Sequence, residues 1–155
     1  MEIAPLADHM EFVDEMAQLH QAEWAHLSSI LTVKDRKNAL ENAAGREGIP
    51  SIYIAYENNE FIGSVALIEH DLDTHLELSP WLAAVFVKER WRGQGIATLL
   101  VSFCEVQAKQ IGVKKLYLST ELATQLYSKL GWEVIERCEY RAIELDIMFK
   151  KIASY

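Results

Sequence analysis

The stretch that decides the fold reads Trp81-Leu82-Ala83-Ala84-Val85-Phe86-Val87 and continues, after residues 88–91, as Arg92-Gly93-Gln94-Gly95-Ile96-Ala97-Thr98. The nearly continuous apolar run at 81–87 predicts a central strand that is covered on both faces. Apolar residues at helical spacing then predict a helix over 96–110, which Gly112 ends. A buried strand therefore leads through a glycine-containing turn directly into a helix.

This junction has the features of a phosphate site. The first turn of a helix leaves backbone N–H groups unpaired, and the helix dipole places partial positive charge there. Gly93 and Gly95 carry no side chains, so the backbone can approach a large anion closely, and Arg92 adds a cation. The junction thus predicts a pyrophosphate cradle. Taken alone, a Gly-x-Gly sequence is as typical of a plain tight turn between strand and helix.

Two other phosphate motifs do not fit the same residues. The dinucleotide-binding fingerprint needs a third glycine where Thr98 stands. The Walker loop needs Gly-Lys-Ser or Gly-Lys-Thr, and neither occurs in the sequence. A nucleotide-binding domain of either kind is therefore disfavoured.

The rest of the chain alternates helical and strand patterns. Before the junction we expect a helix over 10–31, a second helix that a Thr32 capping box opens and Gly45 closes, and strands at 49–56 and 61–68 joined by an asparagine turn. After a polar loop at 70–80 and the junction, we expect a strand at 115–119, a helix at 121–130, a strand that starts at 132–135 and a strand at 143–150. The pattern predicts one mixed α/β domain over 1–155.

Composition narrows the function classes. The 155 residues, half of them hydrophobic, suffice for one core, and no apolar run reaches the roughly 18 residues of a membrane helix. The net charge of −8 argues against a nucleic-acid partner and suits a cationic substrate or plain solubility. Cys104 and Cys138 lie in apolar patterns and resemble small buried hydrophobes, not a disulfide or metal set. With no signal peptide at the start, a cytoplasmic protein without a metal is expected.

Two segments resemble known signatures. Arg92-x-x-Gly95-x-Ala97 is similar to the acetyl-CoA signature of the GNAT family of N-acetyltransferases, Gln/Arg-x-x-Gly-x-Gly/Ala. Residues 123–132, with Leu126-Tyr127 followed by Gly131-Trp132, resemble the second signature of the family. The order of the expected elements also resembles that of the family. Thr120 departs from the pattern, because asparagine is common seven residues before the tyrosine.

The resemblance implies a fold and a cofactor. The fold is a central mixed, mostly antiparallel sheet with flanking helices, in which the strand at 81–87 splays away from its neighbour. Acetyl-CoA would be the cosubstrate, and no metal is implied. The residues that would bind it are Val85, Phe86, Val87, Arg92, Gly93, Gln94, Gly95, Ile96, Ala97, Thr98 and, less directly, Thr120. Val87 N–H would stabilise the oxyanion that forms during acyl transfer.

The resemblance also implies catalytic roles. Tyr127 would be the general acid, since a phenol stays protonated at neutral pH; otherwise it is a core aromatic. Among the loop residues 70–77, Glu77 is nearest the cofactor strand and is the candidate general base, although a chain of waters could serve. Trp24 and Trp81 are candidates for lining the acceptor pocket.

The acceptor is a small-molecule amine or a protein amine: polyamines, aminoglycosides, amino acids and protein N-termini or lysines all fit. No membrane partner is expected, and a homodimer is compatible with the sequence. The alternative function is a regulatory module that binds CoA without catalysis.

Overall fold

The computed structural model describes residues 1–28 and 30–152. Its strands are β1 (Glu2–Pro5), β2 (Ser51–Glu57), β3 (Glu60–Ile68), β4 (Trp81–Val87), β5 (Lys115–Thr120), β6 (Glu133–Tyr140) and β7 (Ile143–Lys151). Its α-helices are α1 (Val13–Trp24), α2 (Val33–Ala43), α3 (Ile96–Gln110) and α4 (Thr124–Lys129). Short 3-10 turns are η1 (Leu6–Asp8), η2 (Met10–Phe12), η3 (Ala25–Leu27) and η4 (Glu89–Trp91).

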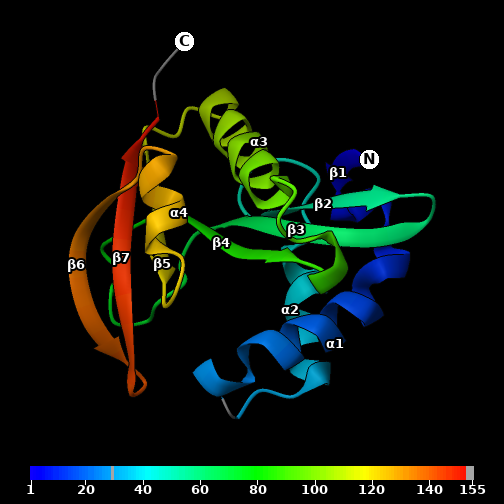
Figure 1. The fold of residues 1–155 in the computed structure, drawn as a ribbon, viewed down its shortest axis with the longest axis horizontal. Coiled ribbons are helices and arrows are strands. Elements are labelled where there is room, and N and C mark those ends of the chain that lie inside the picture. Colours follow the sequence, from blue (N-terminus) through cyan, green and yellow to red (C-terminus); the bar gives the residue numbers. More distant parts are fainter. Residues whose placement is uncertain (29, 153–155) are drawn as a thin grey trace.

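The seven strands form one sheet in the order β1-β2-β3-β4-β5-β7-β6. Every neighbouring pair is antiparallel except β4 and β5, which run parallel. The sheet is strongly twisted: β2 and β3 run across the view of Figure 1, whereas β6 and β7 run along its vertical. The mixed, mostly antiparallel sheet expected from the family resemblance is confirmed.

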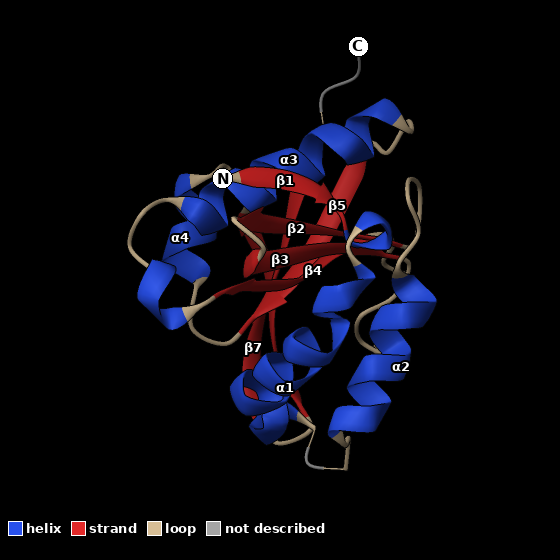
Figure 2. Cartoon of the chain, turned by 90° about the vertical axis from the view of Figure 1, so that its right-hand side faces the viewer, coloured by secondary structure: helices blue, strands red, loops and turns tan. Residues whose placement is uncertain are grey.

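Helices cover both faces of the sheet. Helix α3 lies on one face, and α1 and α2 lie on the other (Figures 1 and 2). On the α3 side, Leu100 and Cys104 are buried against sheet residues such as Val65. On the opposite side, Met16 of α1 and Leu40 of α2 are buried in a second cluster with sheet residues. The sheet therefore separates the α3-side core from the core under α1 and α2, and a gap between its strands would connect the two faces.

Such an opening lies between β4 and β5. The two strands pair at Trp81 and Tyr117 alone, whereas β4 pairs with β3 over nearly its whole length. A bulge interrupts β4 at Ala84, whose φ of 52° is unusual for a residue other than glycine. Beyond this bulge β4 has no partner on the β5 side. The splay expected of this strand is present.

A short hydrogen-bonded chain supports the bulge. The Ser64 hydroxyl donates to the Ala84 carbonyl at 2.8 Å, and His20 Nε2 lies 3.1 Å from the Ser64 oxygen. Because the Ser64 proton goes to Ala84, His20 must carry its proton on Nε2 and donate to Ser64. Burial, followed by the charge of Arg36, lowers the pKa of His20 to about 4, so the ring is neutral.

The predicted elements are mostly present, with some differences. The capping box is confirmed: Asp35 N–H donates to Thr32 Oγ1, and the Asp35 carboxylate accepts from Thr32 N–H. The first helix ends at Trp24 instead of residue 31, because Arg36 Nη2 donates to the Trp24 carbonyl and η3 follows. Strand β1 was not predicted, and α4 is shorter than the 121–130 expected.

The last hairpin has a turn that was not predicted. Strand β6 begins at Glu133, within the expected start, runs to Tyr140 and turns into β7 through Arg141 and Ala142. Both turn residues have positive φ, 52° and 68°, which sequence rules assign to glycine or asparagine. Across residues 1–28 and 30–152, no helix is both long enough and apolar enough to cross a membrane.

Candidate active site

The turn between β4 and α3 has the geometry that its glycines predict. Gly93 and Gly95 adopt left-handed conformations with φ of 77° and 81°, and Gly95 is the N-cap of α3. No side chain caps this helix, so the N–H groups of its first turn point outward unpaired. A Cβ atom at either glycine would meet no protein atom within 4 Å. The helix end is thus open toward a ligand.

A cavity of about 440 Å³ lies in front of this turn. Its lining includes ten residues predicted from the sequence: Val85, Phe86, Val87, Arg92, Gly93, Gly95, Ile96, Ala97, Thr98 and Tyr127. It also includes four that were not predicted: Glu23, Trp91, Ala123 and Leu126. The cavity therefore joins the glycine turn, the splayed half of β4 and helix α4.

The free edge of β4 presents its backbone to the cavity. Lys88 N–H donates to the Ile62 carbonyl at 2.8 Å, so the backbone at Lys88 faces β3. Backbone groups alternate in direction along a strand, so the N–H and C=O of Val87 and of Val85 face the β5 side. There β4 has no strand partner. Val87 N–H is therefore a hydrogen-bond donor directed into the gap, as its expected role requires.

Arg92 lies at the cavity but is not a free cation. Its Nε donates to the Val87 carbonyl at 2.7 Å, and its guanidinium lies 5.6 Å from the centre of the Phe86 ring. Its Nη2 is 3.4 Å from a carboxylate oxygen of Glu23, whose side chain is 42% exposed. Arg92 thus ties the glycine turn to β4 and to α1 while keeping its positive charge at the cavity wall.

Tyr127 faces the cavity from α4. The residue is 7% exposed, and its ring packs edge-on against Trp132 with 6.3 Å between the ring centroids. Within the described part of the chain, its hydroxyl has no hydrogen-bond partner. Burial raises the pKa of Tyr127 to about 12, so the phenol is protonated throughout the neutral range. Tyr127 is thus a core aromatic that also lines the cavity, so the core position predicted for it does not exclude the predicted role as general acid.

Two of the residues predicted to bind the cofactor do not line the cavity. Gln94 lies in the glycine turn and is exposed. Thr120 is buried, and its Oγ1 accepts a hydrogen bond from Ala123 N–H at 2.9 Å. This bond fixes the turn before α4, so Thr120 positions the helix that carries Tyr127 while its backbone and side chain stay outside the cavity lining.

The two tryptophans differ from each other. Trp81 is 0% exposed, and its indole N–H donates to the Leu78 carbonyl at 2.8 Å. Because it presents no surface, the expectation that Trp81 lines an acceptor pocket is wrong; it belongs to the core. Trp24 is half-buried at the end of α1, with its ring 6.2 Å from that of Phe86, which lines the cavity. Trp24 therefore borders the cavity on the α1 face.

Two carboxylates of the loop before β4, Glu77 and Asp71, differ in their surroundings. Glu77 is exposed in this loop and does not line the cavity. Asp71 remains accessible to solvent, yet the protein around its carboxyl group raises its pKa by desolvation, and Ser119 Oγ donates to it at 3.4 Å. Leu118 packs on the α3 side of β5, so its neighbour Ser119 faces the opposite side. Asp71 therefore lies on the sheet face that carries α1 and α2.

The comparisons with known proteins agree on one family. The sequence model of the acetyltransferase (GNAT) domain matches residues 49–134. N-alpha-acetyltransferase 30 of Schizosaccharomyces pombe is 30% identical over 95 residues, which are 59% of this chain and 59% of that protein. The match with this relative spans about three fifths of its length, and the residues matched by the family model include the β4–α3 junction.

Solved structures share the whole fold. An aminoglycoside 6'-N-acetyltransferase complexed with coenzyme A superposes with a TM-score of 0.79 at 16% identity, over 100% of this chain and 99% of that one. A ribosomal-protein-alanine N-acetyltransferase from Brucella melitensis superposes with a TM-score of 0.72 at 18% identity, over 91% of this chain and 94% of that one. At these identities the likeness concerns the fold alone.

Proposed function

The chain belongs to the GNAT acetyltransferase family, and from this premise we propose that it transfers the acetyl group of acetyl-CoA to a primary amine. One observation carries the proposal: beyond its bulge β4 is paired with β3 but not with β5, and this open side of the strand lines the cavity in front of the Gly93–Gly95 turn. An elongated ligand with a phosphate group at one end and hydrogen-bonding groups along its length fits such a surface.

The residues present suit acetyl-CoA in two places. The uncapped first turn of α3, with Gly93 and Gly95 beside it, would bind the pyrophosphate through backbone N–H groups. The outward-facing backbone groups of Val85 would hydrogen-bond the pantetheine arm between β4 and β5, because the Val87 carbonyl already accepts from Arg92 Nε. Acetyl-CoA supplies an activated acyl carbon, and the chain supplies the surroundings in which an amine can attack it.

The groups around the gap match the needs of acyl transfer. The amine nitrogen forms a bond to the acyl carbon, and the bond from that carbon to sulfur breaks. Val87 N–H would donate to the acyl oxygen as negative charge gathers there. Tyr127 would give its proton to the departing thiolate, and its high pKa keeps that proton available at neutral pH. A base must take the proton that the attacking amine loses.

We assign the base to the loop between β3 and β4. Glu77 remains a candidate from the sequence, and among the other loop residues Asp71 becomes a second one, because it lies on the face opposite α3 and desolvation raises its pKa. An acceptor that approaches from the α1 face would meet Asp71 before it reaches the gap. Asp71→Asn and Glu77→Gln, measured separately, distinguish the two carboxylates through the loss of kcat.

The acceptor we propose is a cationic amine. The net charge of −8 and the exposed Glu23 at the cavity favour such a molecule electrostatically. The names of the relatives point to two groups of amines, aminoglycosides and protein N-termini. An acceptor panel should therefore contain an aminoglycoside, a polyamine, a free amino acid and peptides with free N-termini.

The proposal is tested by binding and by turnover. Acetyl-CoA at about 100 times its Kd should stabilise the protein by about 2.7 kcal/mol, and NAD should not. At least one amine of the panel should release free CoA thiol at a rate proportional to enzyme concentration. Binding without release by any amine would instead favour the regulatory module, and equal stabilisation by NAD would overturn the cofactor assignment.

A further inference from the structure

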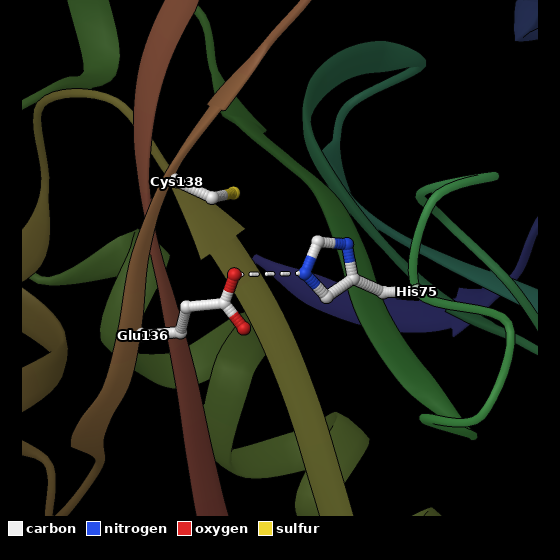
Figure 3. A group of neighbouring side chains, drawn as sticks. All are labelled: His75, Glu136 and Cys138. Atoms are coloured by element: carbon white, nitrogen blue, oxygen red, sulfur yellow. Dashed lines mark hydrogen bonds and ion pairs between the residues drawn. The ribbon is translucent and has the colours of Figure 1, made fainter.

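A second group of reactive side chains lies where the loop before β4 packs on β6. His75 comes from that loop, and Glu136 and Cys138 come from β6 (Figure 3). One potential ligand atom from each, an imidazole nitrogen, a carboxylate oxygen and a sulfur, lie within 4.8 Å of one another. None of the three lines the 440 Å³ cavity.

The backbone holds these three side chains on one side of the hairpin. Glu136 and Cys138 are two residues apart in β6, so their side chains point to the same face of the strand. His75 faces them from the loop, and its Nε2 lies 3.1 Å from a Glu136 oxygen, the contact drawn as a dashed line in Figure 3. Residues 61 to 63 positions apart in the sequence thus meet, which explains why chain spacing gave no sign of the group.

The loop is anchored independently of these side chains. The Tyr140 hydroxyl donates to Asp73 at 3.1 Å, and the guanidinium of Arg141 lies 3.5 Å from the same carboxylate. Leu72 is buried in a cluster with Trp81, Leu145 and other residues of this side. His75 is therefore held near β6 whether or not anything binds there, and the side chain is only 12% exposed.

The donor set is one that Zn²⁺ prefers. Imidazole, carboxylate and thiolate are its usual protein ligands, and three of them leave a fourth position for water. Tetrahedral coordination at usual bond lengths separates the ligand atoms by about 3.3–3.8 Å, so closure needs a movement of only about 1 Å at the cysteine. Of the nearby cations, Arg137 is paired with Glu144 and Asp146. Arg141 lies beside Asp73.

A further neighbour prepares His75 for this role. Thr74 Oγ1 lies 2.7 Å from His75 Nδ1 and can accept a hydrogen bond from Nδ1–H, so a metal ion that replaced the proton between Nε2 and Glu136 would bind a histidine whose other nitrogen is already held.

We propose that His75, Glu136 and Cys138 bind one Zn²⁺ ion that fastens the loop before β4 to strand β6. The same loop carries Asp71 and Glu77, so an occupied site would hold the candidate bases in place. This last consequence rests on the proposed function, whereas the site itself does not.

The test uses Co²⁺ as a spectroscopic substitute for Zn²⁺ on the reduced, full-length protein. We expect one equivalent of Co²⁺ to bind with a thiolate-to-metal charge-transfer band, and Zn²⁺ to displace it. Cys138→Ser should remove the band, and His75→Ala should weaken Co²⁺ binding by at least about 10-fold. Glu136→Gln should weaken it as well.

Matched controls come from the same chain. Cys104→Ala removes a thiol that is fully buried in α3, with a pKa raised to about 12, and should leave the band unchanged. His70→Ala removes a histidine of the same loop outside the group. A band that persists in Cys138→Ser, or the absence of any band in the parent protein, would overturn the site. Because this readout needs no acetyl-CoA, its failure is distinct from failure of the proposed function.

Discussion

The two halves of β4 are both apolar, yet they differ in what lies on their β5 side. Its first half, Trp81 to Ala83, is paired with β3 and, at Trp81, with β5. Its second half, Val85 to Val87, is paired with β3 alone and lines the cavity. Both halves consist of apolar residues that a sequence reader would place in the same buried strand. The difference shows that pairing, not residue type, makes one half structural and the other available to a ligand.

The dividing point is Ala84. Ala84 has a positive φ, and the register between β3 and β4 shifts at this residue. The Ser64 hydroxyl donates a hydrogen bond to the Ala84 carbonyl, and His20 donates one to the Ser64 oxygen. The orientation of the second half of β4 therefore depends on hydrogen bonds from Ser64 and from His20 of helix α1. Four predictions test how separate the two halves are.

The largest effect should come from closing the end of the cavity with a side chain. Gly95→Glu should abolish detectable acetyl-CoA binding, because the carboxylate occupies the open space at the α3 N-terminus and repels a pyrophosphate. Isothermal titration calorimetry measures this directly. The positive φ also adds about 1–2 kcal/mol of strain, so stability must be compared with a control.

Gly112→Glu is that control. Gly112 has φ of 87° and open space around its Cβ position, but it lies beyond the opposite end of α3. Both variants should therefore lose similar stability in urea unfolding, and only Gly95→Glu should lose the cofactor. Equal loss of binding in the two variants would assign the effect to general strain and remove the cradle from α3.

The next effect concerns the proton donor across the gap. Tyr127→Phe keeps the ring and its contact with Trp132, so it should bind acetyl-CoA almost normally and melt within a few degrees of the parent. Its kcat should fall by roughly 10- to 1,000-fold, because only the transition state needs the proton. The measurement is CoA thiol release with an acceptor from the panel. An unchanged kcat, with chemistry rate-limiting, would leave Tyr127 a purely structural residue.

A third effect is a pH dependence of stability that originates at the bulge. The pKa of His20 is about 4 in the folded protein and near 6.5 when exposed, so the unfolded chain binds the proton more readily. The stability contributed by neutral His20 is complete above pH 6.5 and is lost as pH falls to about 4, amounting to about 3 kcal/mol. Urea unfolding of the parent and of His20→Leu between pH 7.5 and 4.5 gives the difference; parallel curves would contradict it.

The smallest effect comes from removing the Ser64 hydroxyl at the bulge, compared with removing a buried hydroxyl elsewhere. Ser64→Ala should cost about 1–2 kcal/mol of stability, since it leaves the Ala84 carbonyl and the His20 N–H unpaired. Ser51→Ala should cost a similar amount, because Ser51 is also 0% exposed and donates to the Gly48 carbonyl at 2.7 Å. Only Ser64→Ala should also weaken acetyl-CoA affinity, by several-fold. Equal affinities would mean that the bulge does not depend on Ser64.

The sequence predicted the parts of the site that are local in the chain. The apolar run, the two glycines and the first turn of α3 follow one another within eighteen residues, so spacing and turn chemistry suffice to define them. Tyr127 was found through its motif alone, and its neighbour Leu126 could have been added from the same segment. The fold class followed from the order of elements, whereas β1 and the turn at Arg141 and Ala142 gave no local signal.

What the sequence could not predict depends on contacts between distant segments. Glu23 reaches the cavity because α1 crosses the sheet beside Arg92, and nothing in residues 13–24 indicates this. Trp81 and Trp24 looked alike as pocket candidates, but Trp81 is 0% exposed where β4 pairs with β5, whereas Trp24 is half-buried beside Phe86. The meeting of His75 with Glu136 and Cys138 likewise depends on a loop that folds back on β6.

The single pairing of Trp81 with Tyr117 has a mechanical consequence. A sheet carries load sideways through its ladder of backbone hydrogen bonds, and here the ladder between β4 and β5 has one residue pair. Strands β5 to β7 are therefore joined to the rest of the sheet more by side-chain packing than by backbone. A ligand arm that hydrogen-bonds to β4 in this gap would supply hydrogen bonds that β5 does not make. The sheet would then be stiffer while the gap between β4 and β5 is occupied by a ligand, and its backbone hydrogen bonding would be continuous only in the bound form.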